Sequence, residues 1–357
     1  MIQTHFFSDF NNTSRLFLRQ YFNRAKILGF FFFLSCFISF LCYADNSNLA
    51  FSETINSSAE TSSPLLIDRS AVKLLNKMKA SVLDNDYKLY FIVQDEDEYP
   101  NSYQYTYVGS KINKKGALLS LEGSAKEIIL NDNIVSYFLI DSASFSIAAN
   151  RIIEVFPDVI YSDFDSLIPN YDFINLGKGR VANRSCQLIR IISKDKDRYS
   201  YVIWIDDENF LPLRIDLLDL NSKIINQKKV LVVDFDFNKQ KFEDYIADRV
   251  YPILYPIDKE DSDRKDWQVT WLPKGFKRID TYNINFQESN IDTQHFTDGI
   301  FSFTINVSKR TQYDKVNLSI QGDRSIYSYN QGNLNIIIIG NLPAETIKQI
   351  AYHLKFK

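Results

Sequence analysis

The sequence is poor in the residues from which metal and catalytic sites are usually built. Its 357 residues include three histidines and three cysteines. Zinc sites need cysteines and histidines at short spacing, and no such pair occurs. A nucleophile elbow of the form G-x-S-x-G is also absent. These absences predict a protein that is not an enzyme and that uses no metal and no cofactor.

Disulfide bonds and a strong positive charge are also missing from most of the chain. Cys186 is the only cysteine after Ala44, so the chain that follows Ala44 cannot form an internal disulfide. We expect this lone thiol to be buried and inert. Residues 1–44 hold four of the 41 basic and one of the 44 acidic residues, which leaves 37 basic and 43 acidic residues, a net charge of −6. Nucleic-acid binding needs a basic face, so we expect no nucleic-acid partner.

The first 44 residues have the pattern of an export signal. Four basic residues between Arg15 and Lys26 precede the apolar run Ile27–Ala44, which ends in a small residue. This pattern predicts a signal peptide over residues 1–44, cleaved near Ala44. The alternative is an uncleaved anchor, because 18 apolar residues just suffice to span a membrane. Residues 45–62 are rich in Asn, Ser and Thr and predict a flexible lead.

The pattern of apolar residues then predicts a helix followed by a long run of strands. Ser63 and Pro64 resemble a helix start, and apolar residues recur at helical spacing from Ile67 to Val82. Up to residue 249 most segments alternate with period 2, and Leu231 and Val233 are assigned to the apolar face. Such segments, joined by short turns, predict an open antiparallel sheet packed on one side. A loop or short helix is expected over Pro157–Pro169.

The fold class predicted from these patterns is α+β. A curved, open β half-barrel covered by helices is expected over residues 63–249. A linker over residues 250–265 and a small α+β domain over residues 266–357 are expected to follow. In that domain Asn341 is expected to cap the last helix. The G-K-G segment at Gly177 lacks the spacing of a phosphate loop and predicts a turn before a strand.

Large apolar residues of many strands share one face, and a single helix is too narrow to cover them all. They are predicted to line an apolar ligand-binding cleft between sheet and helix; an ordinary filled core is the alternative. The predicted lining residues are Leu119, Leu121, Ile129, Tyr137, Tyr201, Ile203, Leu213 and Ile215.

Several segments, taken in order, resemble motifs of the periplasmic sigma-E regulators of the RseB/MucB family. They are LLSLEGSAKEII, VANRSCQLIRI, DRYSYVIWIDDENFLPLRIDLLD, WQVTWLPKGF, HFTDGIFSFTINV and IIIIGNLPAETIKQIA. No single motif is specific, but their shared order over residues 65–356 is. The sequence departs from the family at Asn183, where the family often has glycine.

The resemblance implies a large domain similar to the lipoprotein carriers LolA and LolB. It implies a periplasmic negative regulator of the envelope-stress sigma factor. The implied partner is the periplasmic part of a single-pass anti-sigma factor of the RseA/MucA type, shielded from regulated proteolysis and released by lipid or lipopolysaccharide. A homo-oligomer is also compatible with the sequence. The alternatives are a periplasmic carrier of lipid or lipoprotein on the same fold and, more distantly, an exported hydrolase with scattered catalytic residues.

Cleavage near Ala44 is the first testable prediction. The basic start, the apolar run and the polar lead after Ala44 together direct export and processing. N-terminal sequencing of the exported protein should therefore give a start close to Asp45. A start at Met1 with retention of the protein in the membrane would contradict this prediction.

Overall fold

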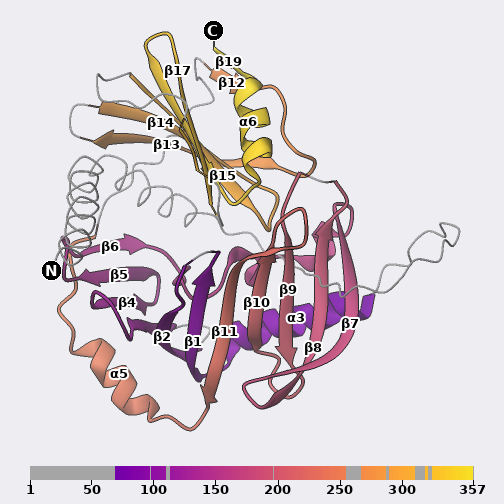
Figure 1. The fold of residues 1–357 in the computed structure, drawn as a ribbon. Helices are drawn as coiled ribbons and strands as arrows, with labels where there is room; N and C mark the ends of the chain where they lie inside the picture. The colour runs from indigo at the N-terminus through magenta and orange to yellow at the C-terminus, as the bar shows by residue number, and fades with distance from the viewer. Residues whose placement is uncertain are drawn as a thin grey trace, which may run out of the picture.

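The computed structural model describes residues 69–96, 98–109, 113–195, 197–254, 267–286, 289–309, 318–320 and 324–356. The predicted signal peptide, the lead and residues 255–265 of the predicted linker lie outside these ranges. Among the described residues, eleven strands form one antiparallel sheet and six strands form a second. Figure 1 shows the two sheets in separate layers, with the small one above the large one.

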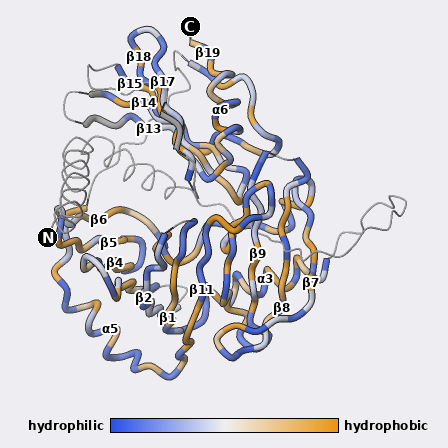
Figure 2. Tube along the Cα trace, viewed as in Figure 1, coloured by the Kyte–Doolittle hydropathy of each residue, from blue (hydrophilic) through white to orange (hydrophobic). Residues whose placement is uncertain are grey.

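The large sheet is open and runs in the order β6-β5-β4-β3-β2-β1-β11-β10-β9-β8-β7. Hydrophobic and hydrophilic residues alternate along its strands (Figure 2), as the period-2 pattern predicts. Its strands are β1 Tyr87–Asp95, β2 Asn101–Val108, β3 Lys115–Ser120, β4 Lys126–Asn131, β5 Ile134–Leu139, β6 Phe145–Ala148, β7 Tyr171–Val181, β8 Arg184–Ser193, β9 Ser200–Asp206, β10 Pro212–Leu218 and β11 Ile224–Asp234.

Helix α3, Arg69–Asp84, covers the inner face of this sheet and confirms the predicted amphipathic helix. Figure 1 shows it crossing behind β7 to β10. Its buried stripe includes Leu75 and Met78, and neither side chain is exposed to solvent. At its end, the hydroxyls of Tyr87 and Tyr107 donate to the carbonyls of Val82 and Leu83 at 3.1 and 3.2 Å. The sheet therefore satisfies carbonyls that the helix leaves unpaired.

The segment between β6 and β7 fills the rest of the inner face. It contains the 3-10 helix η1, Asp158–Tyr161, and the short helix α4, Phe164–Leu167, which confirms the expected loop or short helix. This segment places seven side chains in the main core, each no more than 4% exposed: Ile152, Val155, Phe156, Val159, Ile160, Phe164 and Leu167.

The outer face of the sheet is covered at one end by helix α5, Lys239–Ala247. Ile246 and Phe242 of this helix pack with Ala117 and Ile129 in a cluster separate from the main core. Beyond the helix, the backbone N–H of Ser146 in β6 donates to the carbonyl of Ile253 at 3.1 Å. The first residues of the predicted linker thus lie along the edge of β6.

A β-bulge corrects the face that the sequence assigned to Leu231. Tyr90 of β1 pairs with Val232, whereas the next residue, Phe91, pairs with Val230. Leu231 is the extra residue, and it lies 49% exposed on the outer face, while Val230 is buried. A bulge adds one residue to a strand and so reverses the alternation beyond it, which a strict period-2 pattern does not anticipate.

The G-K-G segment lies within β7, so the predicted turn is wrong. Leu176 is the extra residue of a bulge, and Gly177, which follows it, has a φ of +94°. A Cβ on Gly179 would lie 2.3 Å from Cζ3 of Trp204, so glycine lets the indole lie across β7. The turn follows β7 instead, at Ala182 and Asn183, whose φ angles are 50° and 62°. Asparagine tolerates this left-handed conformation, which explains how Asn183 replaces glycine.

The small domain packs helix α6, Ala344–Tyr352, on its six-stranded sheet. The helix N-cap is Pro343 and not Asn341 as expected. The strands are β13 Lys277–Phe286, β14 Ser289–Thr297, β15 Ser302–Lys309, β16 Leu318–Ile320, β17 Ser325–Gln331 and β18 Leu334–Gly340, and β12 Trp267–Val269 pairs with β19 Leu354–Phe356. Together the two domains confirm the predicted α+β class, with an open sheet and a smaller second domain.

Cys186 is predicted to be inert towards thiol reagents in the native protein. It lies in β8 with no exposed surface, and burial raises the pKa of its thiol to about 11. Because the thiolate is the reactive form, labelling at neutral pH should require unfolding. The measurement is labelling with a chromogenic disulfide reagent with and without denaturant; fast labelling without denaturant would contradict the burial.

Candidate functional site

The structure brings five of the eight predicted cleft residues together on the inner face. Tyr137, Tyr201, Ile203, Leu213 and Ile215 are all buried members of the main core. A cavity beside Leu213 and Ile215 has a volume of about 10 Å³, and Val155 and Phe156 also line it. That volume is about enough for one water molecule. Leu213 and Ile215 thus lie in a filled part of the core, whereas Tyr201 also lines the larger cleft described below.

The other three predicted residues lie on the opposite face, which corrects their assignment. Leu118 and Ile128 pair across β3 and β4 and enter the main core. Their neighbours Leu119 and Ile129 therefore point outward, Leu119 to solvent and Ile129 against α5. Leu121 lies just beyond β3 and is 48% exposed. Because consecutive strand residues alternate, a choice one position off places the side chain on the wrong face.

A larger cleft, of about 260 Å³, lies where the large sheet meets the small domain. Its floor comes from β1, β2 and β9 to β11, with Tyr103 and Tyr201 among its aromatic residues. One wall is Ile153–Asp158, and the other carries Ile300, Arg324 and Asn341 of the small domain. Its charged residues have both signs: Asp95, Glu154, Asp158, Lys228 and Arg324. Mixed charge and apolar surface suit a peptide segment better than a hydrocarbon chain.

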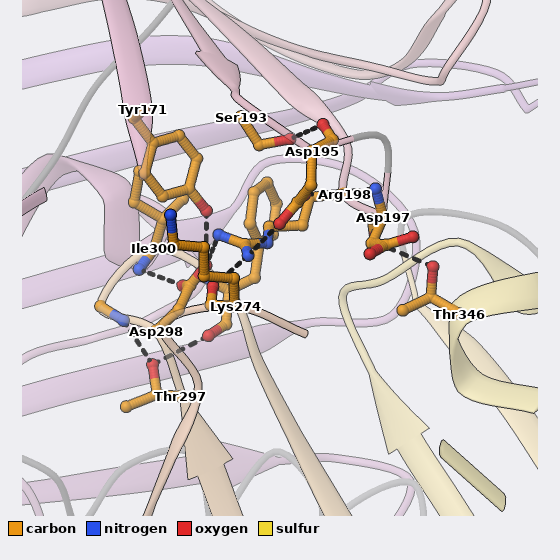
Figure 3. Close-up of polar contacts among 12 residues, drawn as sticks. Tyr171, Ser193, Asp195, Asp197, Arg198, Lys274, Thr297, Asp298, Ile300 and Thr346 are labelled. Atoms are coloured by element: carbon orange, nitrogen blue, oxygen red, sulfur yellow. Dashed lines mark hydrogen bonds and ion pairs between the residues drawn. The ribbon is translucent and has the colours of Figure 1, made fainter. Parts of the chain in front are cut away.

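Beside this cleft, a buried ion pair joins the two domains. Arg198 precedes β9 in the large domain, and Asp298 lies in the turn between β14 and β15 of the small domain. Nη1 of Arg198 lies 2.9 Å from Oδ2 of Asp298, and both side chains are 0% exposed. The hydroxyl of Tyr171, at the start of β7, donates to the same oxygen at 2.5 Å. We call Arg198, Asp298 and Tyr171 the latch, which Figure 3 shows.

Two polar atoms of the latch, Nη2 of Arg198 and Oδ1 of Asp298, have further partners, whereas Nε of Arg198 is buried with no hydrogen-bond partner in the part of the chain that the structure describes. Nη2 of Arg198 donates to Asp195 at 2.6 Å and also to the carbonyl of Lys274 in the small domain. The guanidinium lies 5.3 Å from the ring centroids of both Tyr171 and Phe276. Oδ1 of Asp298 accepts from the backbone N–H groups of Ile300 and Phe301 at 2.9 and 2.8 Å. Asp298 therefore holds its own turn as well as the other domain.

Burial and pairing shift the pKa of the latch carboxylate, Asp298, in opposite directions. Burial raises the pKa of Asp298, whereas Arg198, the Tyr171 hydroxyl and the two backbone amides oppose this shift. Burial also raises the pKa of the Tyr171 hydroxyl far above its ordinary value, so it remains a hydrogen-bond donor. Each buried charge depends on its partner, because an unpaired charge in the interior is costly.

Three further contacts surround the latch. Ser162 Oγ donates to the carbonyl of Gly299 at 2.6 Å, and Thr346 Oγ1 donates to the carbonyl of Asp197 at 2.8 Å. The rings of Tyr201 and Phe301 stack at 5.5 Å between centroids. Sequence reasoning did not predict these residues as a site. The sequence did contain a pointer to this site. Four of the family-like motifs each contribute one residue to it: Arg198, Lys274, Asp298 and Thr346.

The described ranges contain no group of three or more His, Cys, Asp or Glu residues arranged to hold a metal ion. Within the same residues, no helix has the length and hydrophobicity needed to cross a membrane. The described site therefore offers binding surface, aromatic rings and paired charges.

The fold and the site define a two-domain protein in which an open antiparallel half-barrel is latched to a small α+β domain beside a shared cleft. The chain belongs to the MucB/RseB family. Residues 70–252 match the MucB/RseB N-terminal domain, and residues 261–355 match the MucB/RseB C-terminal domain. The family resemblance identified from the motifs is confirmed.

Relatives and a solved structure agree with this membership. The sigma-E factor regulatory protein RseB of Haemophilus influenzae is 36% identical over 290 residues, which is 81% of this chain and 92% of that protein. RseB of Escherichia coli K12 is 30% identical over 286 residues, 79% of this chain and 90% of that protein. The Pseudomonas aeruginosa MucA/MucB complex contains a chain of similar fold, with a TM-score of 0.64, 16% identity and coverage of 81% and 99%.

Breaking the latch should destabilise the protein. Asp298→Asn removes the counter-charge of Arg198, and Asp195 compensates only in part, so the free energy of unfolding should fall by roughly 2–4 kcal/mol. Urea unfolding followed by tryptophan fluorescence measures the change. The control is Lys178→Ala, which removes an exposed ion pair with Asp207 and should change stability by no more than about 0.5 kcal/mol. Equal effects of the two substitutions would contradict the role of the latch.

Proposed function

We propose that this protein is a negative regulator of the envelope-stress sigma factor. It binds the periplasmic part of a single-pass anti-sigma factor and shields that segment from regulated proteolysis. The observation that carries the proposal is that both family domains are present and in order, over more than 90% of the length of a relative named as a sigma-E factor regulatory protein. A carrier that only transports lipid needs one domain.

The solved relative supports a protein partner for this fold. The P. aeruginosa structure is a complex of MucB with MucA, and a second solved structure is MucB in complex with MucA(peri). For this chain we propose a partner of the same kind, bound so that it touches both domains. The cleft at the junction supports this arrangement, since residues of both domains line it.

Shielding follows from simple linkage. A protease must accommodate its substrate as an extended, accessible strand, so a segment held against a folded surface is cleaved only from its free fraction. At a regulator concentration 100 times the dissociation constant, binding protects the segment by about 2.7 kcal/mol. Loss of the regulator then increases cleavage without any chemistry by the regulator itself, and we propose that the protein is not an enzyme.

The carrier alternative needs an inner cavity that accepts an acyl chain. The cavity beside Leu213 and Ile215 has a volume of only about 10 Å³. The larger cleft is lined by five charged residues. Both observations favour a protein partner. Lipid or lipopolysaccharide can act as a releasing signal only if it binds better to the free protein than to the complex.

We propose the periplasm as the location, with the signal peptide removed near Ala44. This location would place the protein beside the exported segment of a single-pass inner-membrane protein. Membership of a family of sigma-E regulators supports it.

The proposal is tested with the periplasmic segment of the anti-sigma factor from the same cell. The purified segment should bind this protein with a single affinity and should be cleaved more slowly by the regulatory protease when bound. Titration with lipopolysaccharide measures release. Absence of binding, together with binding of a fatty acid by the free protein, would overturn the regulator and favour the carrier.

A charge placed in the cleft should weaken binding of that segment. Ile153 lies in the cleft wall and is only partly buried. Ile153→Glu should raise the dissociation constant by about tenfold or more, because a contact worth about 1.4 kcal/mol is replaced by a desolvated charge. Leu231→Glu, at an exposed apolar residue on the outer face, is the matched control and should change affinity by less than about twofold. An equal loss of affinity in both variants would mean that the partner segment does not bind in the cleft.

A further inference from the structure

The latch and the cleft are built from the same two short segments. Arg198 belongs to the latch, and Tyr201, three residues later, lines the cleft. Asp298 belongs to the latch, and Ile300, two residues later, lines the cleft on the opposite side. The ring of Phe301 closes the arrangement by stacking on Tyr201 with an interplanar angle of 13°. A displacement of Tyr201 in the cleft floor, or of Ile300 in the small-domain wall, is therefore transmitted along two or three residues of backbone to a latch residue.

The latch leaves little freedom for small rotations. Both charged side chains are 0% exposed, and a Cβ on Gly275 would lie 2.5 Å from Nδ2 of Asn170 across the domain junction. The hydrogen bonds of Ser162 to Gly299 and of Thr346 to Asp197 lie on separate elements. Rotation of the small domain would break these contacts together with the ion pair. Packed interfaces in general switch between discrete arrangements and do not bend gradually.

We propose that the latch is a positioning device that couples occupation of the cleft to the orientation of the two domains. The closed latch holds Tyr201 and Ile300 at the spacing that the partner segment needs. An occupant that fits this spacing favours the closed state, and one that wedges Tyr201 and Ile300 apart breaks the ion pair and favours the open state. This inference rests on the proposed function only for the identity of the occupant.

An ion pair suits this role better than an apolar contact. A buried pair adds little net stability, because desolvation offsets the attraction between the charges. The pair nevertheless destabilises every domain orientation in which the two charges are apart and still buried away from water. It therefore selects one arrangement of the domains.

The distance between the domains gives the first test. Labels are attached to Tyr99→Cys in the large domain and Tyr352→Cys in the small domain, which are 93% and 77% exposed. The exported protein, which begins near Asp45, is used with its single cysteine, Cys186, replaced by alanine. With nitroxide spin labels on these cysteines, pulsed electron–electron double resonance should give one narrow distance population for the parent protein. Asp298→Asn and Arg198→Met should each add a second, broader population.

The control variant is Asp206→Asn. Asp206 is as buried as Asp298 and pairs with Arg184 at 2.7 Å, but both residues lie within the large domain. It should lower stability and keep the single distance population. A distance distribution that is identical in the parent, Asp298→Asn and Arg198→Met proteins would overturn the proposal. So would a second population in Asp206→Asn of the same size.

Binding of the anti-sigma segment gives the second test. The Asp298 side chain is fully buried and cannot touch a partner, yet Asp298→Asn should weaken binding by about tenfold, and Asp206→Asn by less than about twofold. The double variant Arg198→Met/Asp298→Leu should weaken binding by less than the product of its single variants, because neither charge is left unpaired. Unchanged affinity in Asp298→Asn with an altered distance distribution would overturn the coupling. If the parent binds no segment, the proposed function fails, while the distance test still decides whether the latch orients the domains.

Discussion

The constraint on which the rest of the structure depends is the buried ion pair between Arg198 and Asp298. Neither charge reaches solvent, so each must be paired wherever the domains meet. Satisfying the pair requires Tyr171 at the start of β7, the carbonyl of Lys274 and the backbone amides after Asp298. Together with Arg198, these groups lie in four different segments of the chain. Their common meeting point sets the orientation of the small domain and, through Tyr201 and Ile300, the shape of the cleft.

The inner face of the open half-barrel is filled by the protein's own side chains and does not form a large ligand cavity. Helix α3 covers part of the inner face, and residues 152–167 pack seven buried apolar side chains over the rest. Apolar burial there stabilises the sheet by roughly 1.5–3 kcal/mol for each fully buried large side chain. The cost of filling the inner face is that little space remains for an acyl chain. The cleft of about 260 Å³ lies instead at the domain junction, where both domains contribute polar and apolar groups.

The family motifs acquire physical roles in this arrangement. Asp298 and Gly299 of the HFTDG segment form the turn that carries the latch carboxylate, with Gly299 at a φ of 101°. Gly275 of the WLPKGF segment allows close approach to Asn170. Thr346, in the last helix, bonds the backbone beside Arg198. Asn183 takes the left-handed conformation that the β7–β8 turn requires, with a φ of 62°.

The sequence by itself determined the α+β class, the antiparallel strands, the covering helix and the burial of Cys186, because these follow from local periodicity and composition. It also contained the ordered motifs that place the chain in its family. Only the tertiary structure decided which face Leu119, Ile129 and Leu231 occupy, since register and bulges depend on the neighbouring strand. It alone revealed the latch, whose members Tyr171 and Arg198 lie 127 and 100 residues from Asp298. Period-2 alternation describes one strand at a time, whereas pairing across such a separation depends on how whole domains pack.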